Sequence, residues 1–77
     1  MEEFLDYVIR SLVEHPDEVI ITRRDEGRNV VFLLKLRQSD VGAVIGRNGQ
    51  TIAAIRALVA AAAARNDLRS SVEIIED

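Results

Sequence analysis

Cysteine is absent from this 77-residue chain, and histidine, lysine and proline each occur once. Without cysteine the chain forms neither disulfides nor thiolate metal sites, and the single His15 cannot build a metal cluster. We therefore expect no cofactor. The longest apolar run, Ala57 to Ala64, is far shorter than the roughly 20 residues that span a bilayer. The N-terminal MEEFLDYVIR is acidic, unlike a secretory signal, so we expect a cytoplasmic protein without a membrane partner.

Arginine supplies nine of the ten basic residues, and the charges are segregated along the chain. Residues 1–18 hold six acids and one base, residues 19–69 hold nine bases and four acids, and residues 70–77 hold three acids. The net charge of −3 thus hides a positive middle segment. Because salt screens charges beyond about 8–10 Å, this segment can attract an anion even in an acidic protein. The planar fork of arginine suits phosphate, although codon usage explains the arginine bias equally well.

The first half of the chain has the hydrophobic periodicity of a helix followed by a hairpin. Helical spacing of apolar residues extends from Glu2 to Val13. Strands are predicted from Val19 to Arg24 and from Val30 to Arg37, joined by the turn Asp25 to Asn29. Alternation along the second strand predicts one set of side chains facing the helices: Val30, Phe32, Leu34 and Leu36.

The second half is predicted to hold two helices and a last strand. Ser39 or Asp40 can cap a short helix that ends at Ile45. The next helix covers Gln50 to Arg65, and Val72 to Ile75 forms the strand. Because this strand returns after two helices, we expect it to lie parallel to a hairpin strand. The predicted fold is α+β, a mixed three-stranded sheet with helices packed on one face, in a single domain over residues 1–77.

The most informative motif joins the two predicted helices and reads IGRNGQTI, from Ile45 to Ile52. Gly46 and Gly49 can adopt positive φ without steric cost, so they permit one helix to end and the next to begin within a few residues. Neither glycine carries a Cβ, and an anion can therefore approach the peptide N–H groups near the positive end of the second helix. Arg47 adds a permanent charge. We call Gly46 to Gly49 the glycine turn, and we expect it to bind phosphate.

This motif resembles the mark of the KH domain family of single-stranded RNA binders, I-G-x-x-G-x-x-I between two short helices. Every fixed position of the pattern is present in Ile45 to Ile52. The order αββααβ is similar to the type II, bacterial arrangement, and the resemblance covers essentially the whole chain. The stretch VGAVIGRNGQTIAAIR and the acidic start resemble the small stand-alone bacterial KH proteins of the KhpA group.

The resemblance implies that the glycine turn, with Arg47 and Asn48 between its two glycines, clamps the backbone of about four nucleotides. Bases would then turn toward an apolar groove between the helices and the sheet. The residues expected to line or flank it are Val41, Val44, Thr51 and Ile55, with Lys35 and Arg37 on the nearby strand and Arg56 on the second helix. Alanines occupy most other exposed positions of that helix, which implies modest affinity or the need for a partner.

Other functions remain open at this point. Val31 and Leu33 are predicted to be exposed on the sheet face away from the helices, which favours a KH-fold dimerisation or protein-interaction module. A helix-turn-helix DNA binder is a weaker alternative, because the alanine-rich second helix has few side chains that reach base edges. Ser11 and His15 lie about one helical turn apart, but nothing marks an orienting third group, so we expect no enzymatic activity.

The expected function is therefore binding of short single-stranded RNA with low sequence selectivity, as an RNA chaperone or post-transcriptional regulator. The resemblance also implies a protein partner, either a second copy in a homodimer or a larger RNA-binding protein in a heterodimer. No small-molecule substrate is expected.

Overall fold

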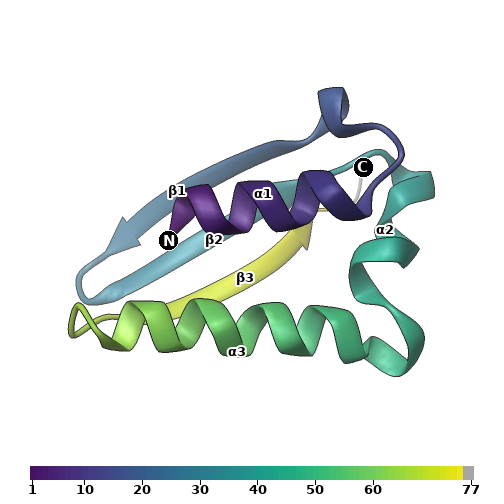
Figure 1. Ribbon diagram of the computed structural model, residues 1–77. Helices are drawn as coiled ribbons and strands as arrows, with labels where there is room; N and C mark the ends of the chain where they lie inside the picture. Colours follow the sequence, from purple (N-terminus) through teal and green to yellow (C-terminus); the bar gives the residue numbers. More distant parts are fainter. Residues whose placement is uncertain (76–77) are drawn as a thin grey trace.

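The computed structural model describes residues 1–75, and its elements follow the predicted order (Figure 1). Helix α1 (Glu2–Leu12) and the 3₁₀ turn η1 (Pro16–Glu18) precede strands β1 (Ile20–Glu26) and β2 (Asn29–Lys35). Helix α2 (Gln38–Ile45), the 3₁₀ turn η2 (Arg47–Gly49) and helix α3 (Gln50–Ala64) precede strand β3 (Arg69–Ile75). The predicted α+β class is confirmed.

The three strands form one mixed sheet with β2 in the centre. Strand β1 pairs antiparallel with β2, and β3 pairs parallel with β2, so Phe32 lies between Arg23 and Val72. The hairpin is tighter than predicted, because only Gly27 and Arg28 separate β1 from β2. Gly27 has a φ of +63°, and a glycine with positive φ at the first position of a two-residue turn matches the twist of the flanking strands.

Helices α1 and α3 run side by side over one face of the sheet, and α2 closes the end of this layer away from the hairpin (Figure 1). The β2 side chains predicted to face the helices are buried, as the alternation requires. They pack in one core with side chains from all three helices. The core includes Leu5, Ile9, Val30, Phe32, Leu34, Leu36, Val41, Val44, Ile52, Ile55, Val59 and Val72.

Strand β3 begins at Arg69, whereas the sequence predicts a start at Val72. The added residues Arg69 to Ser71 are polar and give no strand signal. They pair with Asn29 to Val31 of the central strand, and this pairing holds them in an extended conformation. Tertiary context therefore sets the start of this strand, as is common for residues with weak strand preference.

The sheet face away from the helices, which we call the open face, exposes less apolar surface at its centre than predicted. Val31 is only 5% exposed, so the prediction that it is exposed is wrong, and Leu33 is half-buried. Arg24 and Ser71 are the ladder neighbours of Val31, and Arg24 forms an ion pair at 2.7 Å with Glu26, two residues further along β1. The aliphatic stems of such side chains cover apolar surface while their charged ends stay in water.

Candidate functional site

The glycine turn lies where α2 meets α3, at the end of the molecule opposite the β1–β2 hairpin (Figure 1). Arg47 and Asn48 are exposed, and the two glycines are half-buried. Asn48 (φ +55°) and Gly49 (φ +72°) both adopt left-handed backbone conformations, which reverse the chain between the two helices. The predicted joint is therefore present as an exposed turn.

Gly46 has a structural reason to be glycine. Its φ of 76° and ψ of 177° fall in a region that only glycine adopts without strain. A Cβ built on Gly46 would lie 2.1 Å from Thr51 Oγ1 and 2.5 Å from Thr51 Cβ, far inside contact distance. Thr51 of α3 thus packs directly against the backbone of the turn, and it is half-buried there.

Gly49 differs, because a Cβ built on it would meet no atom within 4 Å. The space beside Gly49 is open to a ligand. Among residues 1–75, no hydrogen bond uses the backbone N–H of Arg47 or Asn48, whereas the N–H groups of Gly46 and Gly49 donate to Gly42 O (2.9 Å) and Gly46 O (3.2 Å). The turn thus presents two unused amides, both on exposed residues, and successive N–H groups in such a left-handed turn suit an anion.

Arg47 carries a charge that no carboxylate of the described chain neutralises. Five arginines form ion pairs with acids at 2.6–3.0 Å: Arg10, Arg23, Arg24, Arg28 and Arg37. In residues 1–75, the arginines without an acidic partner are Arg47, Arg56, Arg65 and Arg69. Half of the eight arginines in the positive middle segment (residues 19–69) are thus paired with acids, and Arg47 is one of the four that are left to attract a polyanion.

A shallow groove runs between α3 and β3. Its lining residues are Arg56, Ala57, Ala60, Ser70, Ser71, Val72 and Glu73. Arg56 spans the groove, since its Nε and Nη2 both donate to Val72 O at 3.1 Å. Arg56 lies about 10 Å beyond Gly49 along the axis of α3, by the rise of a helix. We call this the α3–β3 groove. The groove and the glycine turn are thus joined by α3 but separated by about two turns of this helix.

The residues predicted to line a groove are only partly brought together. Val41, Val44 and Ile55 belong to the core and are at most 8% exposed, so the prediction that they line an accessible groove is corrected. A domain of this size needs the inward faces of α2 and α3 for its core, which leaves those side chains unavailable. Among the predicted residues, Arg56 alone lines the α3–β3 groove.

Lys35 and Arg37 are exposed, but both lie outside the α3–β3 groove. Lys35 is the ladder neighbour of Ile20 and Ile75, and all three side chains project from the sheet face opposite the helices. Arg37 precedes the first turn of α2 and forms an ion pair with Glu18 at 3.0 Å. Neither side chain lines the groove beside Arg56.

The alanines and serines that line the groove were not among the site residues predicted from the sequence. Ala57 and Ala60 lie one turn apart on the exposed side of α3, and Ser70 and Ser71 lie in the part of β3 that was not predicted as strand. Alanine on the exposed side of a helix leaves room beside a neighbouring strand. The spacing of these alanines, one helical turn apart, was the feature of the sequence that could have indicated the groove.

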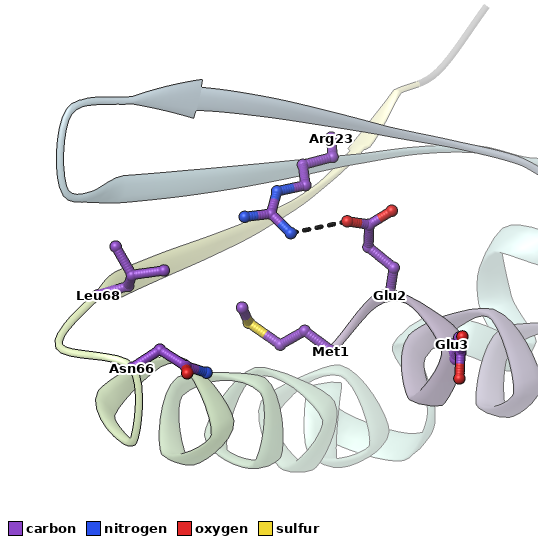
Figure 2. A pocket seen from close by; sticks show the side chains of 6 residues that line it. All are labelled: Met1, Glu2, Glu3, Arg23, Asn66 and Leu68. Carbon is purple, nitrogen blue, oxygen red and sulfur yellow. Dashed lines mark hydrogen bonds and ion pairs between the residues drawn. The ribbon is translucent and has the colours of Figure 1, made fainter.

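A second hollow lies at the opposite end of the helix layer, between the start of α1, β1 and the end of α3 (Figure 2). Glu2 and Glu3 line it, and Arg23 points into it with its guanidinium 2.7 Å from Glu2 Oε1. Arg23 also pairs with Asp25 at 3.0 Å. With two carboxylates and an arginine that is already paired, this hollow does not suit a phosphate.

Ser11 and His15 have separate partners. Ser11 Oγ donates to Tyr7 O at 2.6 Å, and His15 Nδ1 lies 3.2 Å from Asp40 Oδ2.

Residues 1–75 contain no group of three or more side chains placed to hold a metal ion. Within the same range, no helix is both long enough and apolar enough to cross a membrane.

Comparison with protein families matches residues 2–74 to the family described as KhpA/KhpB, KH domain. An RNA-binding protein KhpA of Chlamydia pneumoniae is 42% identical over 77 residues, which cover 100% of this chain and 99% of that protein. A protein of the same name from Listeria monocytogenes serovar 1/2a is 38% identical over 76 residues, 99% of this chain and 100% of that protein. Comparison with solved structures gives no significant match.

Proposed function

The chain belongs to the KhpA/KhpB family of KH-domain proteins, and from this premise we propose that it binds single-stranded RNA through the glycine turn. The observation that carries the proposal is the pair of exposed, unused amides of Arg47 and Asn48. Phosphate oxygens accept hydrogen bonds from such amides, and the unpaired Arg47 guanidinium can add a bidentate contact. Open space beside Gly49 allows the sugar-phosphate backbone to approach.

Low sequence selectivity follows from the same arrangement. Contacts to phosphate fix the position of a nucleic acid but do not read its sequence. In the α3–β3 groove, small alanine and serine side chains offer few groups that could distinguish one base from another. Arg56 and Glu73 are the charged residues that line it, and Arg56 already donates to Val72 O. Weak, unselective binding would suit an RNA chaperone or post-transcriptional regulator in the cytoplasm, without catalysis.

The test compares two variants with the same change in charge. The tripeptide Gly-Arg-Asn occurs twice, at residues 46–48 in the turn and at residues 27–29 in the hairpin. We expect Arg47→Asp/Asn48→Asp to abolish binding of a labelled single-stranded RNA oligomer in fluorescence anisotropy. Arg28→Asp/Asn29→Asp lowers the net charge equally at the far end of the molecule, and we expect it to retain binding. Equal loss in both variants would mean that only net charge matters.

Competition with duplex DNA separates this proposal from the helix-turn-helix alternative. The exposed side of α3 carries Ala53, Ala57, Ala60 and Ala64, which cannot reach base edges in a major groove. We therefore expect unlabelled single-stranded RNA to displace the probe and duplex DNA to compete poorly. Stronger competition by duplex DNA would favour the helix-turn-helix reading.

Pairing with a second copy, or with another RNA-binding protein, is our second proposal. Large apolar side chains are exposed on the helix layer, with Tyr7 of α1 73% and Leu58 of α3 55% exposed. Ile20 and Ile75 add exposed apolar area on the open sheet face, where Val31 does not. The mass of the pure protein in solution, measured with and without RNA, tests whether it forms a homodimer. A monomer at all concentrations would leave only a heterologous partner.

A further inference from the structure

Asp40 is the one charged residue in the described part of the chain that is buried, at 3% exposure. Its carboxylate accepts hydrogen bonds from the backbone N–H of Glu14 and of His15, both at 3.1 Å. His15 Nδ1 lies 3.2 Å from the same carboxylate and donates when it carries the proton. A buried carboxylate needs such partners, and within residues 1–75 every buried side-chain polar atom has a hydrogen-bond partner.

These bonds join segments that are distant in sequence. Glu14 and His15 follow the end of α1, whereas Asp40 lies in the first turn of α2, 25–26 residues later. The carboxylate also lies near the positive end of α2, where a negative charge is favourable. The hydrogen bonds of Asp40 therefore connect the start of α2 to the residues that follow α1.

The other end of α2 is the glycine turn. From Asp40 to Gly46 the helix rises about 9 Å. The hydrogen bonds of Asp40 and the glycine turn therefore lie at the two ends of one short helix. An isolated helix of eight residues is not stable in water, so its orientation depends on its contacts. Val41 and Val44 anchor its inner side in the core, and Asp40 fixes its first turn.

We propose that Asp40 is a positioning residue for the glycine turn, an inference that rests on the proposed RNA-binding function. Core contacts of two valines permit α2 to tilt, because apolar contacts have little directional preference. Hydrogen bonds from two successive amides to one carboxylate fix direction as well as distance. The tilt of α2 in turn sets where the amides of Arg47 and Asn48 point, and a phosphate contact tolerates only small displacements of its donors.

The test uses Asp40→Asn, which keeps the side-chain shape but places an NH₂ group against backbone donors. We expect RNA affinity to fall by about tenfold, roughly the loss of one hydrogen bond to phosphate. We also expect the amide NMR signals of Arg47 and Asn48 to shift at a temperature where the protein remains folded. Val30→Ala is the matched control, because Val30 is a buried residue of β2 that pairs with Asp25 beside the hairpin turn. The hairpin lies at the end of the molecule away from α2 (Figure 1).

A merely structural role for Asp40 would lower the affinity no more than Val30→Ala does at equal fraction folded, and would leave the two amide signals in place. Either result overturns the inference. If Asp40→Asn does not fold, His15→Ala replaces it, since this change removes one contact and leaves both backbone bonds to Asp40. We then expect a smaller shift of the same two signals, and no shift would refute the positioning role.

Failure of this inference can be distinguished from failure of the proposed function. If Arg47→Asp/Asn48→Asp binds RNA normally, RNA binding through the turn is refuted, whatever the signals in Asp40→Asn do. If the double aspartate variant loses RNA binding but Asp40→Asn retains full affinity, only the positioning role is refuted.

Discussion

Alanine at Gly42 of α2 and at Gly46 and Gly49 of the glycine turn should change the free energy of unfolding by three different amounts, because the three sites differ in backbone conformation and in space. Gly42 is helical, and a Cβ there meets nothing within 4 Å. Gly42→Ala should therefore stabilise the protein by up to about 1 kcal/mol through helix propensity. Gly49→Ala has the same free space but a φ of +72°, and it should cost about 1–2 kcal/mol for the left-handed conformation.

Gly46→Ala should be the most harmful of the three. Its backbone conformation costs an alanine about 1–3 kcal/mol. The new Cβ would also lie 2.1 Å from Thr51 Oγ1, so Thr51 must move, and such overpacking typically costs about 1–3 kcal/mol more. Together these cost about 2–6 kcal/mol, which reaches the lower end of the roughly 5–15 kcal/mol by which native proteins are stable. We expect Gly46→Ala to be marginally folded or unfolded.

Urea and thermal unfolding followed by circular dichroism measure these differences, since 1 kcal/mol shifts the Tm of a domain this small by about 4–8 °C. A Gly46→Ala variant as stable as Gly49→Ala would refute the argument from the Thr51 contact. RNA affinity adds a second readout for Gly49→Ala. Its methyl group enters the open space beside the turn, so we expect weaker RNA binding than in a control of equal stability. Unchanged affinity would show that the backbone of RNA does not pass Gly49.

Three further predictions concern charge. If RNA binding neutralises about three charges, log affinity should fall with log salt with a slope of about −2, and a flat response in an anisotropy titration would count against phosphate contacts. Arg56→Ala should lower the free energy of unfolding by about 1–3 kcal/mol, because Val72 O loses two donors, and urea unfolding with Arg56→Lys as the partial rescue checks this. Burial raises the pKa of Asp40, but the hydrogen bonds from Glu14 and His15 outweigh burial and leave it below the ordinary value. Its contribution to stability should thus be present above about pH 4 and be lost as the pH falls further, and urea unfolding from neutral to acid pH should show a smaller acid loss in Asp40→Asn.

The elements could be predicted from the sequence because the apolar residues repeat with clear periods. Alternation in β2 placed Phe32 and Leu34 toward the helices, and both are buried there. The two glycines likewise located the turn, because few other signals end one helix and begin another so abruptly. The start of β3 was missed, since Arg69 to Ser71 become strand only through pairing with β2.

The surface around the turn was less predictable, because it depends on which side chains the core needs. The sequence placed Val41, Val44 and Ile55 beside the turn but could not tell whether they face the core or a ligand. Their burial shows that these side chains pack in the core. The role of Asp40 was not predicted either. Ser39 or Asp40 was expected to cap this helix, but the N-cap is Arg37 without a side-chain hydrogen bond, and the Asp40 carboxylate accepts from Glu14 and His15 instead. Hydrophobic periodicity does not predict which residues distant in sequence will contact one another.

Parallel pairing of β2 with β3 has a consequence for a chain still emerging from the ribosome. The turn lies in the connection between these two strands, so it is synthesised before the strand that completes the sheet. Until Val72 has joined the sheet, Arg56 has no Val72 carbonyl to which it can donate, and α3 lacks the β3 part of the surface on which it packs. A nascent chain that ends before β3 should therefore carry the whole IGRNGQTI motif and still be unable to grip a nucleotide.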